Sequence, residues 1–262
     1  MNEIRDLLIG IDIGKEYTQI CYYDRKAEEA RSLSMKVGTS QYEAPGCICY
    51  RTEQNDYCVG LEAQYFSREK GGIMLGNIYD ICPKEESIQV AGEDKEPAEL
   101  LAHFLKGMLK FLGIQDIVKN TKCMCITSPE LDAIQVRNYQ KACGIAGFPA
   151  EKYMLMDYGE SFYYYALGQK RETWNRSVAW YAFDGDKIAF RKLTINAASR
   201  PILVNLEEPV STTLETEDEI RDVEFCRFIT KTLGKELFSS VQITGEGFDQ
   251  QWAQQSVKLL CH

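Results

Sequence analysis

The sequence lacks the features that mark membrane-spanning and nucleic-acid-binding proteins. Its longest early apolar run covers residues 7–11 and ends at Asp12, whereas a membrane-spanning helix needs roughly 18 apolar residues. Positive charge is in deficit, since 30 lysine and arginine residues oppose 39 aspartate and glutamate residues and give a net charge of -9. A membrane span is therefore not expected, and nucleic acid or an anionic membrane surface is disfavoured as a partner.

A basic leader of the secretory kind is also missing. The chain begins Met1-Asn2-Glu3-Ile4-Arg5-Asp6, with acidic residues where a signal peptide carries basic and then apolar residues. The 262 residues are 45% hydrophobic and 26% charged. This composition can bury the core of one large domain or of two coupled halves, and it is unlike that of a disordered chain. We expect a folded protein of the cytoplasm.

Histidine is scarce, which limits the metal sites that the cysteines can form. The chain has only His103 and His262, together with two Cys-x-Cys pairs at 47–49 and 123–125. On a strand each pair would place two thiols on one face. Zinc is one interpretation, although structural zinc sites usually separate their cysteines by two or more residues. Reduced, buried thiols are the favoured interpretation of the ten cysteines. Examples at apolar positions are Cys21, Cys143 and Cys226.

Strand and helix patterns alternate along the chain. Apolar residues spaced by three and four from Leu100 to Leu112 predict an amphipathic helix, which Pro97 opens and Gly113 ends. The predicted strands cover residues 6–13, 17–23, 31–36, 47–51, 57–60, 122–127, 153–156, 178–183, 188–194 and 240–244, with a weaker strand at 202–206 and a polar loop after it. The predicted helices cover residues 61–67, 97–112, 132–146, 161–167 and 217–233, with a last helix after the turn at 245–248. This order predicts the α/β class with mixed sheets.

Two of the predicted hairpins are alike. In each, an apolar strand delivers an aspartate, Asp12 or Asp184, to a turn that contains glycine. Taken singly, each is ordinary turn chemistry. Two such halves facing each other would direct both aspartates into one cleft, an arrangement that suits a metal ion and a phosphate group.

Several motifs, taken in order, carry a family resemblance. The segment Ile9-Gly10-Ile11-Asp12-Ile13-Gly14, with Thr18 four residues on, resembles the first phosphate-binding hairpin of the actin, sugar-kinase and heat-shock-chaperone ATPase superfamily. Near the other end, Val241-Gln242-Ile243-Thr244-Gly245-Glu246-Gly247-Phe248 is similar to the adenosine motif of that superfamily. The segments between them that are also similar, in the same order, are residues 44–48 with 59–63, 126–129, 144–148 and 157–167.

The resemblance implies an architecture. It indicates an α/β chain with the actin-like (ribonuclease H-like) fold, in which two similar lobes carry mixed five-stranded-type sheets flanked by helices. The first lobe would cover residues 1–150, with a small inserted subdomain at about 36–97. The second lobe would cover residues 151–262 and would be shortened at its C-terminal end, with a small or missing insertion. The chain would be a divergent bacterial member.

The resemblance also implies roles for particular residues. Mg²⁺ would be held by Asp12 and Asp184, and Asp157 stands where the superfamily places an acid that orients the attacking water. The nucleotide, ATP or ADP, would be bound by Asp12, Gly14, Lys15, Thr18, Asp184, Gly185, Lys187, Gly245, Glu246, Gly247 and Phe248. The chain would then act as a conformational switch or an assembly component that a protein partner reads.

Some residues depart from the superfamily pattern. Asp184 is followed by Gly185, Asp186 and Lys187, where chaperones carry three glycines and a threonine, so fewer backbone donors can reach a phosphate. In the first hairpin, Lys15 and Glu16 replace hydroxyl residues. The short interval between residues 193 and 241 lacks the subdomain that the superfamily inserts there. We therefore expect ATP hydrolysis to be weak or absent.

Other functions stay open on the sequence. One is a scaffold that keeps the fold without binding nucleotide, in a larger bacterial assembly. Another is a sugar or acid kinase, for which the sequence offers no base other than Asp157. The aromatic run Phe162-Tyr163-Tyr164-Tyr165 is interpreted as helix packing, with a partner-docking face as the alternative.

Overall fold

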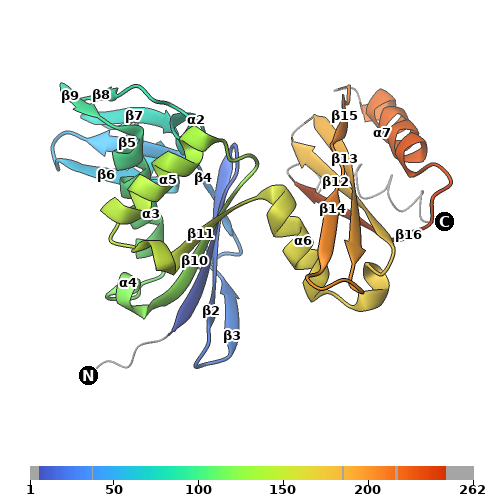
Figure 1. Ribbon diagram of the computed structural model, residues 1–262. Coiled ribbons are helices and arrows are strands. Elements are labelled where there is room, and N and C mark those ends of the chain that lie inside the picture. Colours follow the sequence, from blue (N-terminus) through green and yellow to red (C-terminus); the bar gives the residue numbers. More distant parts are fainter. Residues whose placement is uncertain (1–5, 37, 185, 216–217, 246–262) are drawn as a thin grey trace. The chain divides into compact units, whose positions relative to one another are not determined.

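The computed structural model describes residues 6–36, 38–184, 186–215 and 218–245 and has a mixed α/β architecture. Contacts divide the chain into two units, Met1–Ser161 and Phe162–His262. The division falls within helix α6 (Tyr158–Gly168), eleven residues after the boundary at 150 that the sequence suggested. Each unit is built on its own sheet (Figure 1).

The first unit is built on a sheet with the order β11-β10-β1-β2-β3, and β4 also pairs with β2. The predicted first hairpin is confirmed, since β1 and β2 are antiparallel neighbours joined at Gly14 to Glu16. Strands β10 and β11 follow in parallel with β1, and every second residue of β1 is buried. The strand bounds are β1 Leu7–Ile13, β2 Tyr17–Asp24, β3 Glu29–Ser32, β4 Glu43–Pro45, β10 Thr121–Ser128 and β11 Tyr153–Asp157.

Helices α3 (Pro97–Lys110) and α5 (Ala133–Ile145) cover one face of this sheet (Figure 1). Pro97 opens α3, and the side chains of Glu96 and Glu99 cap each other's backbone N–H groups, as a capping box does. Asp132 caps α5 in the same way. The core between sheet and helices includes Ile9, Ile11, Phe104, Leu105 and Met124, all at most 2% exposed. Both predicted helices are confirmed.

The segment between β4 and α3 forms a small three-stranded sheet, β6-β5-β7, and a two-stranded hairpin. Three of its elements were expected, namely β5 (Cys47–Arg51), β6 (Asp56–Val59) and α1 (Leu61–Phe66). The sequence did not predict the others, because they are short or interrupted by glycine. They are β7 Gly72–Asn77, α2 Ile78–Ile81, β8 Ile88–Val90 and β9 Glu93–Lys95. Short helical turns elsewhere are α4 Ile117–Asn120, η1 Ala150–Lys152 and η2 Arg171–Thr173.

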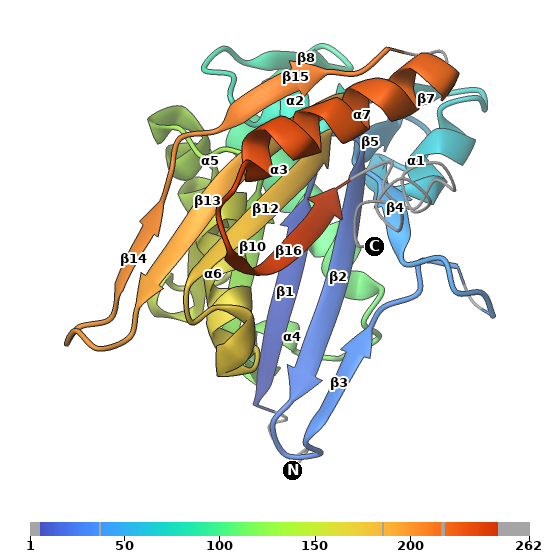
Figure 2. The same cartoon turned by 90° about the vertical axis from the view of Figure 1, so that its right-hand side faces the viewer.

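The second unit is built on a sheet with the order β14-β13-β12-β16, and β15 also pairs with β13. Helix α7 (Asp218–Leu233) lies across one face (Figure 2), where Phe225 and Ile229 pack against Tyr181 and Phe183. On the other face, Phe162 of α6 stacks on Trp180 with the ring centroids 4.3 Å apart. The strands are β12 Ser177–Asp184, β13 Lys187–Asn196, β14 Leu203–Leu206, β15 Val210–Thr213 and β16 Phe238–Gly245.

Three sequence predictions need correction. The strand expected at 31–36 ends at Ser32, because the hydroxyl of Ser34 donates to the carbonyls of Lys36 and Thr39 and so organises a turn. The polar loop expected after 206 contains β15, whose residues pair with β13. Helix α6 begins three residues earlier than expected, at Tyr158. The helix expected after 248 lies outside the described residues.

The two sheets share one strand order. In each, the first strand lies between an antiparallel second strand and a parallel fifth strand, and the third and fourth strands both pair with the second. The first unit adds a parallel sixth strand, β11, beside the fifth strand, β10. Asp12 is the penultimate residue of β1 and Asp184 is the last residue of β12.

Candidate functional site

Polar side chains gather where the parallel strands of the first sheet end. Asp12 near the end of β1 is in register with Thr127 of β10, and Ser128 of β10 is in register with Asp157 of β11. The next residue, Tyr158, begins α6. The carboxyl ends of parallel strands meet at one edge of a sheet, and open α/β sheets bind ligands outside that edge. This edge is the candidate site of the first unit.

Asp12 is a carboxyl group with a shifted pKa at this edge. Burial raises its pKa above the ordinary value, while hydrogen bonds from the hydroxyls of Tyr158 and Thr127 act in the opposite direction. The hydroxyl of Thr127 lies 3.0 Å from Oδ1 of Asp12. The charge of Glu43 adds to the increase, and burial dominates. Asp12 is thus a carboxylate whose negative charge is costly in the ligand-free protein.

The predicted phosphate turn after Asp12 is held in place by residues far along the chain. Gly14 is buried, and its N–H donates to the carbonyl of Tyr17 at 2.9 Å, which closes the hairpin. The carbonyl of Lys15 accepts from Nδ2 of Asn77 at 2.6 Å, and that of Glu16 accepts from the N–H of Gly46 at 2.8 Å. The side chains of Lys15 and Glu16 are exposed. The turn is therefore fixed, and Lys15 is the cation that it presents to solvent.

Thr18 does not lie with the other candidates. It shares the buried face of β2 with Ile20 and is fully buried. Its hydroxyl has no hydrogen-bond partner within the described structure. Thr18 therefore offers no exposed atom to a nucleotide.

Asp157 has a structural partner of its own. Its Oδ1 accepts a hydrogen bond of 2.7 Å from the backbone N–H of Glu160, in the first turn of α6. This is the contact of a helix N-cap, and it satisfies one of the N–H groups that a helix leaves unpaired. The contact accounts for an acid at this position whether or not the acid takes part in catalysis.

In the second unit, two predicted residues lie close together. Asp184 at the end of β12 is in register with Lys187 of β13, and Lys187 is exposed. Between them, the carbonyl of Asp186 accepts from the N–H of Leu214 at 2.8 Å. Gly185, Glu246, Gly247 and Phe248 lie outside the described residues.

Gly245 ends β16 and is paired with Phe183 of β12. Its φ is +100°, and a Cβ built on it would lie 2.0 Å from the carbonyl oxygen of Phe183. Both facts demand glycine. The close approach of β16 to β12 thus explains Gly245 without reference to an adenine ring.

Sequence reasoning gave no role to Thr127, Tyr158 or Asn77, which complete the candidate site. Thr127 and Tyr158 donate to Asp12, and Asn77 holds the turn after it. Thr127 is the last residue of one predicted apolar strand, at 122–127, and Tyr158 lies just beyond another, at 153–156. A search for polar residues at the ends of predicted apolar strands would have identified Thr127 and Tyr158 as candidates. Asn77 ends a strand with no such pattern.

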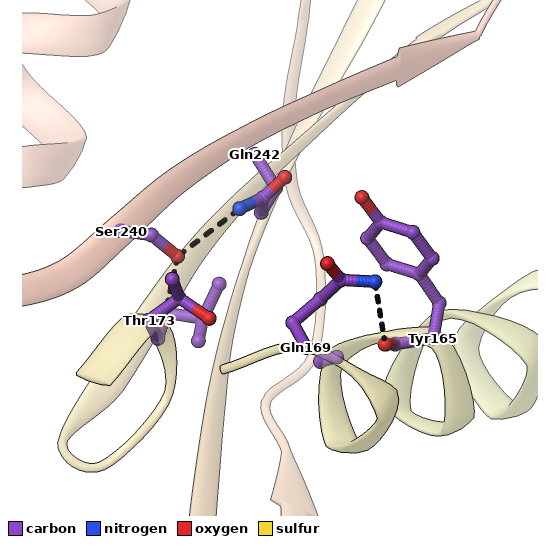
Figure 3. A pocket seen from close by; sticks show the side chains of 7 residues that line it. Tyr165, Gln169, Thr173, Ser240 and Gln242 are labelled. Atoms are coloured by element: carbon purple, nitrogen blue, oxygen red, sulfur yellow. Dashed lines mark hydrogen bonds between the residues drawn. The ribbon is translucent and has the colours of Figure 1, made fainter. Parts of the chain in front are cut away.

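A shallow depression lies between the end of α6 and β16 in the second unit (Figure 3). The hydroxyl of Ser240 donates to the carbonyl of Thr173 at 2.8 Å and accepts from Gln242, so these polar groups satisfy one another. The empty volume of the depression is about 170 Å³ including open solvent, whereas ligand pockets measure about 300–1,000 Å³. The depression is too small to be a nucleotide site.

The described cysteines are free thiols. Burial raises the pKa of Cys58, Cys82 and Cys143 to about 12, which keeps these thiols protonated. Cys21 corrects the expectation of burial, because it lies on the face of β2 opposite Ile20 and is exposed. Among the residues that the structure describes, no three His, Cys, Asp or Glu side chains form a group able to hold a metal ion.

No helix in the described ranges has the length and apolar character to cross a membrane. A comparison with curated proteins found no match. The family described as "Family of unknown function (DUF5716) C-terminal" matches residues 29–262. Because that match covers most of the sequence, the chain belongs to this family.

Proposed function

We propose that the chain is a divergent member of the actin, sugar-kinase and heat-shock-chaperone ATPase superfamily. It binds Mg²⁺ with ATP or ADP and works in the cytoplasm as a conformational switch or assembly component read by a protein partner, and its hydrolysis is weak or absent. The observation that carries the proposal is the strand order shared by the two sheets. In both, the first strand brings an aspartate, Asp12 or Asp184, to a hairpin turn.

The surroundings of Asp12 fit a cation. Burial has raised the pKa of this carboxyl, so a nearby positive ion would offset the cost of its charge. Thr127 and Tyr158 fix the carboxyl group by hydrogen bonds. Bound Mg²⁺ would neutralise and orient the phosphate chain. Asp12 would hold the ion in the first unit and Asp184 in the second.

The exposed Lys15 fits a phosphate group. Its carbonyl is fixed by Asn77, so the backbone that carries the lysine is held in place in the turn that follows Asp12. The N–H of Gly14 is committed to the hairpin, and Thr18 is buried. Of the residues expected to bind phosphate in this turn, Lys15 is therefore the one that we retain.

A scaffold without nucleotide is the second candidate. It is favoured by the structural explanations that Asp157 and Gly245 already have, as a helix cap and as the close approach of two strands. In this alternative the fold is kept for protein contacts alone.

Thermal unfolding with millimolar Mg²⁺-ATP and Mg²⁺-ADP separates the two candidates. A ligand at one hundred times its Kd adds about 2.7 kcal/mol to the stability, which is a rise in Tm of about 5–11 °C for a unit of this size. We expect this rise in the wild type and its loss in Asp12→Asn. Asp24→Asn is the matched control, because Asp24 is half-buried on β2 and its side chain accepts turn hydrogen bonds from the backbone N–H groups of Lys26 and Ala27.

The change in Tm on adding nucleotide distinguishes the two candidate functions and tests the role of Asp12. No rise in the wild type would leave the scaffold as the function. A rise that persists in Asp12→Asn would remove Asp12 from the site. A rise lost equally in Asp24→Asn would show a general effect of charge instead of a site at Asp12.

A further inference from the structure

Sulfur-bearing side chains form a row across the first sheet, on the face opposite to α3 and α5. Cys21 of β2 and Cys125 of β10 are both in register with Gly10 of β1, the strand that lies between them (Figure 2). Met154 of β11 is in register with Cys125 and extends the row. Residues in register on neighbouring strands share a face. The two neighbours of Gly10 on β1 are buried under the helices, so this row lies on the other face.

Gly10 leaves the space between the two cysteines free of any side chain. A Cβ built on Gly10 would lie 2.9 Å from Sγ of Cys21, so this sulfur already lies over the glycine. The Cys21 side chain thus leans from β2 toward β10, where Cys125 lies. The two thiols are near enough that a charge on Cys21 contributes to the raised pKa of Cys125.

Solvent reaches this row, unlike most of the cysteines that the core contains. Cys21 is exposed and Cys125 is half-buried, and both are free thiols. Met154 is 44% exposed. A small ion can therefore approach all three sulfur atoms without unfolding of the sheet.

The spacing suits an ion between the two cysteines and does not suit a disulfide. Neighbouring strands lie about 4.8 Å apart, so the Cα atoms of Cys21 and Cys125 are separated by about 10 Å, beyond the roughly 7 Å that a disulfide spans. Two sulfur–metal bonds of about 2.3 Å each, together with the side chains of both cysteines, bridge this gap.

We propose that Cys21 and Cys125 bind one Cu(I) ion across Gly10, with the thioether of Met154 as a further, weaker ligand. Thiolate and thioether sulfur are the ligands that select Cu(I), whereas structural zinc takes four nitrogen or sulfur ligands. As each Sγ–Cu bond forms, the thiol proton passes to solvent, and neither sulfur nor copper changes its oxidation state. The set holds two cysteines and a methionine, so it differs from the groups of three His, Cys, Asp or Glu that the described residues lack.

The acidity of the two thiols favours a strongly thiophilic ion. Desolvation raises the pKa of Cys125 to about 11 and also raises that of Cys21. Both thiols are therefore protonated at neutral pH in the ion-free protein, and a bound metal ion must displace both protons. A hard ion such as Mg²⁺ prefers oxygen ligands and does not do so. The site is thus distinct in its chemistry from the Mg²⁺ site proposed at Asp12.

Competition of the full chain with a chromophoric Cu(I) chelator, without oxygen or nucleotide, measures the affinity. We expect a high-affinity ion in the wild type. Cys21→Ser and Cys125→Ser should each weaken binding by more than about 100-fold, because losing a residue that only supports a ligand already costs about 10–100-fold. Cys123→Ser is the matched control. It removes a thiol from the same face of β10, but Cys123 is in register with Leu8 and so lies outside the row.

Gly10→Ala tests the geometry, because it keeps every sulfur atom and fills the space between the cysteines. Its Cβ meets Sγ of Cys21, the end of a flexible side chain, so the variant should fold with the Cys21 sulfur turned away. We expect Cu(I) affinity to fall about 10-fold, as when a ligand loses its support. Melting temperatures close to that of the wild type would show that all of these variants are folded.

Three results would overturn the proposal. The wild type could fail to bind Cu(I) more tightly than Cys125→Ser does, Cys123→Ser could lose as much affinity as Cys125→Ser, or Gly10→Ala could bind as tightly as the wild type. All of these variants keep Asp12, and no step needs nucleotide, so failure here is distinct from failure of the proposed function.

Discussion

Asp12→Asn should change the stability of the ligand-free protein in a way that depends on pH. Burial raises the pKa of the Asp12 carboxyl above 3.8, the value of an ordinary aspartate. Between 3.8 and the raised value, the folded chain holds a proton that the unfolded chain has released. The free energy of unfolding therefore falls as the pH rises through that range. Asparagine does not titrate, so the free energy of unfolding of Asp12→Asn should not fall in this pH range for this reason.

Asp12→Asn avoids this pH-dependent loss of stability, but it also loses hydrogen bonding. Asparagine has one carbonyl oxygen to accept from both Thr127 and Tyr158, so it gives up about 1 kcal/mol of hydrogen bonding at every pH. We therefore expect the variant to melt about 2–4 °C below the wild type near pH 4. As the pH rises to 7, the wild type loses stability at Asp12, and the variant should reach or exceed its Tm.

The assay is a series of thermal melts from pH 4 to pH 8. Thr127→Val makes the opposite change, because it keeps the charge of Asp12 and removes the hydrogen bond that Thr127 donates to it. Its deficit should be about 1–3 kcal/mol and should widen as Asp12 ionises. A deficit in Asp12→Asn that is constant, or that grows toward pH 7, would refute the argument that burial dominates at this carboxyl.

Other predictions concern parts of the fold away from Asp12. His103 stacks on Tyr57 at 4.0 Å, and burial and the charge of Lys106 lower its pKa below 6.5, so the folded state resists protonation and stability should fall as the pH drops below 6.5. His103→Gln should show a flatter profile of Tm between pH 6.5 and 5. Asp157→Ala should lose about 1 kcal/mol in a urea titration through loss of the α6 cap, and Asp157→Ser should recover most of it. An equal loss in both would contradict the capping role. Gly245→Ala meets the Phe183 carbonyl and should destabilise the second unit more than Gly234→Ala, which has a φ of +56° and no atom within 4 Å. Comparable melting temperatures for these two variants would exclude the close approach of β16 to β12.

Much of the fold follows from local patterns in the sequence. The first hairpin, helix α3 and the strand–helix pair of β10 and α5 were predicted, because alternation and three-to-four spacing are strong there. β7 was missed because Gly72 and Gly76 interrupt its pattern. β15 was missed because Val210 is its one apolar residue and its pairing with β13 stabilises it. Tertiary pairing decides such short strands, and one sequence does not reveal it.

The candidate site was predicted less well than the fold. Asp12 was selected as a site residue because it lies at the end of a clearly apolar strand, before a turn that contains glycine. The burial of Thr18 also follows from the sequence, because Thr18 and Ile20 are two residues apart on β2 and share its buried face. The contacts of Asp12 with Thr127 and Tyr158 join two strands and a helix end, so only the assembled sheet reveals them.

Asn77 makes the turn after Asp12 a late feature of folding. The hairpin of β1 and β2 needs only neighbouring residues, and hairpins form in about 1–10 μs. The turn has its final hydrogen bond only when Asn77 arrives from 62 residues further along the chain. The Oδ1 of Asn77 accepts from the backbone N–H of Tyr79, so the same side chain also begins α2. The inserted segment therefore cannot be exchanged as an independent module, because a graft without an amide at position 77 would leave the hairpin intact and remove one of the two hydrogen bonds that anchor its turn.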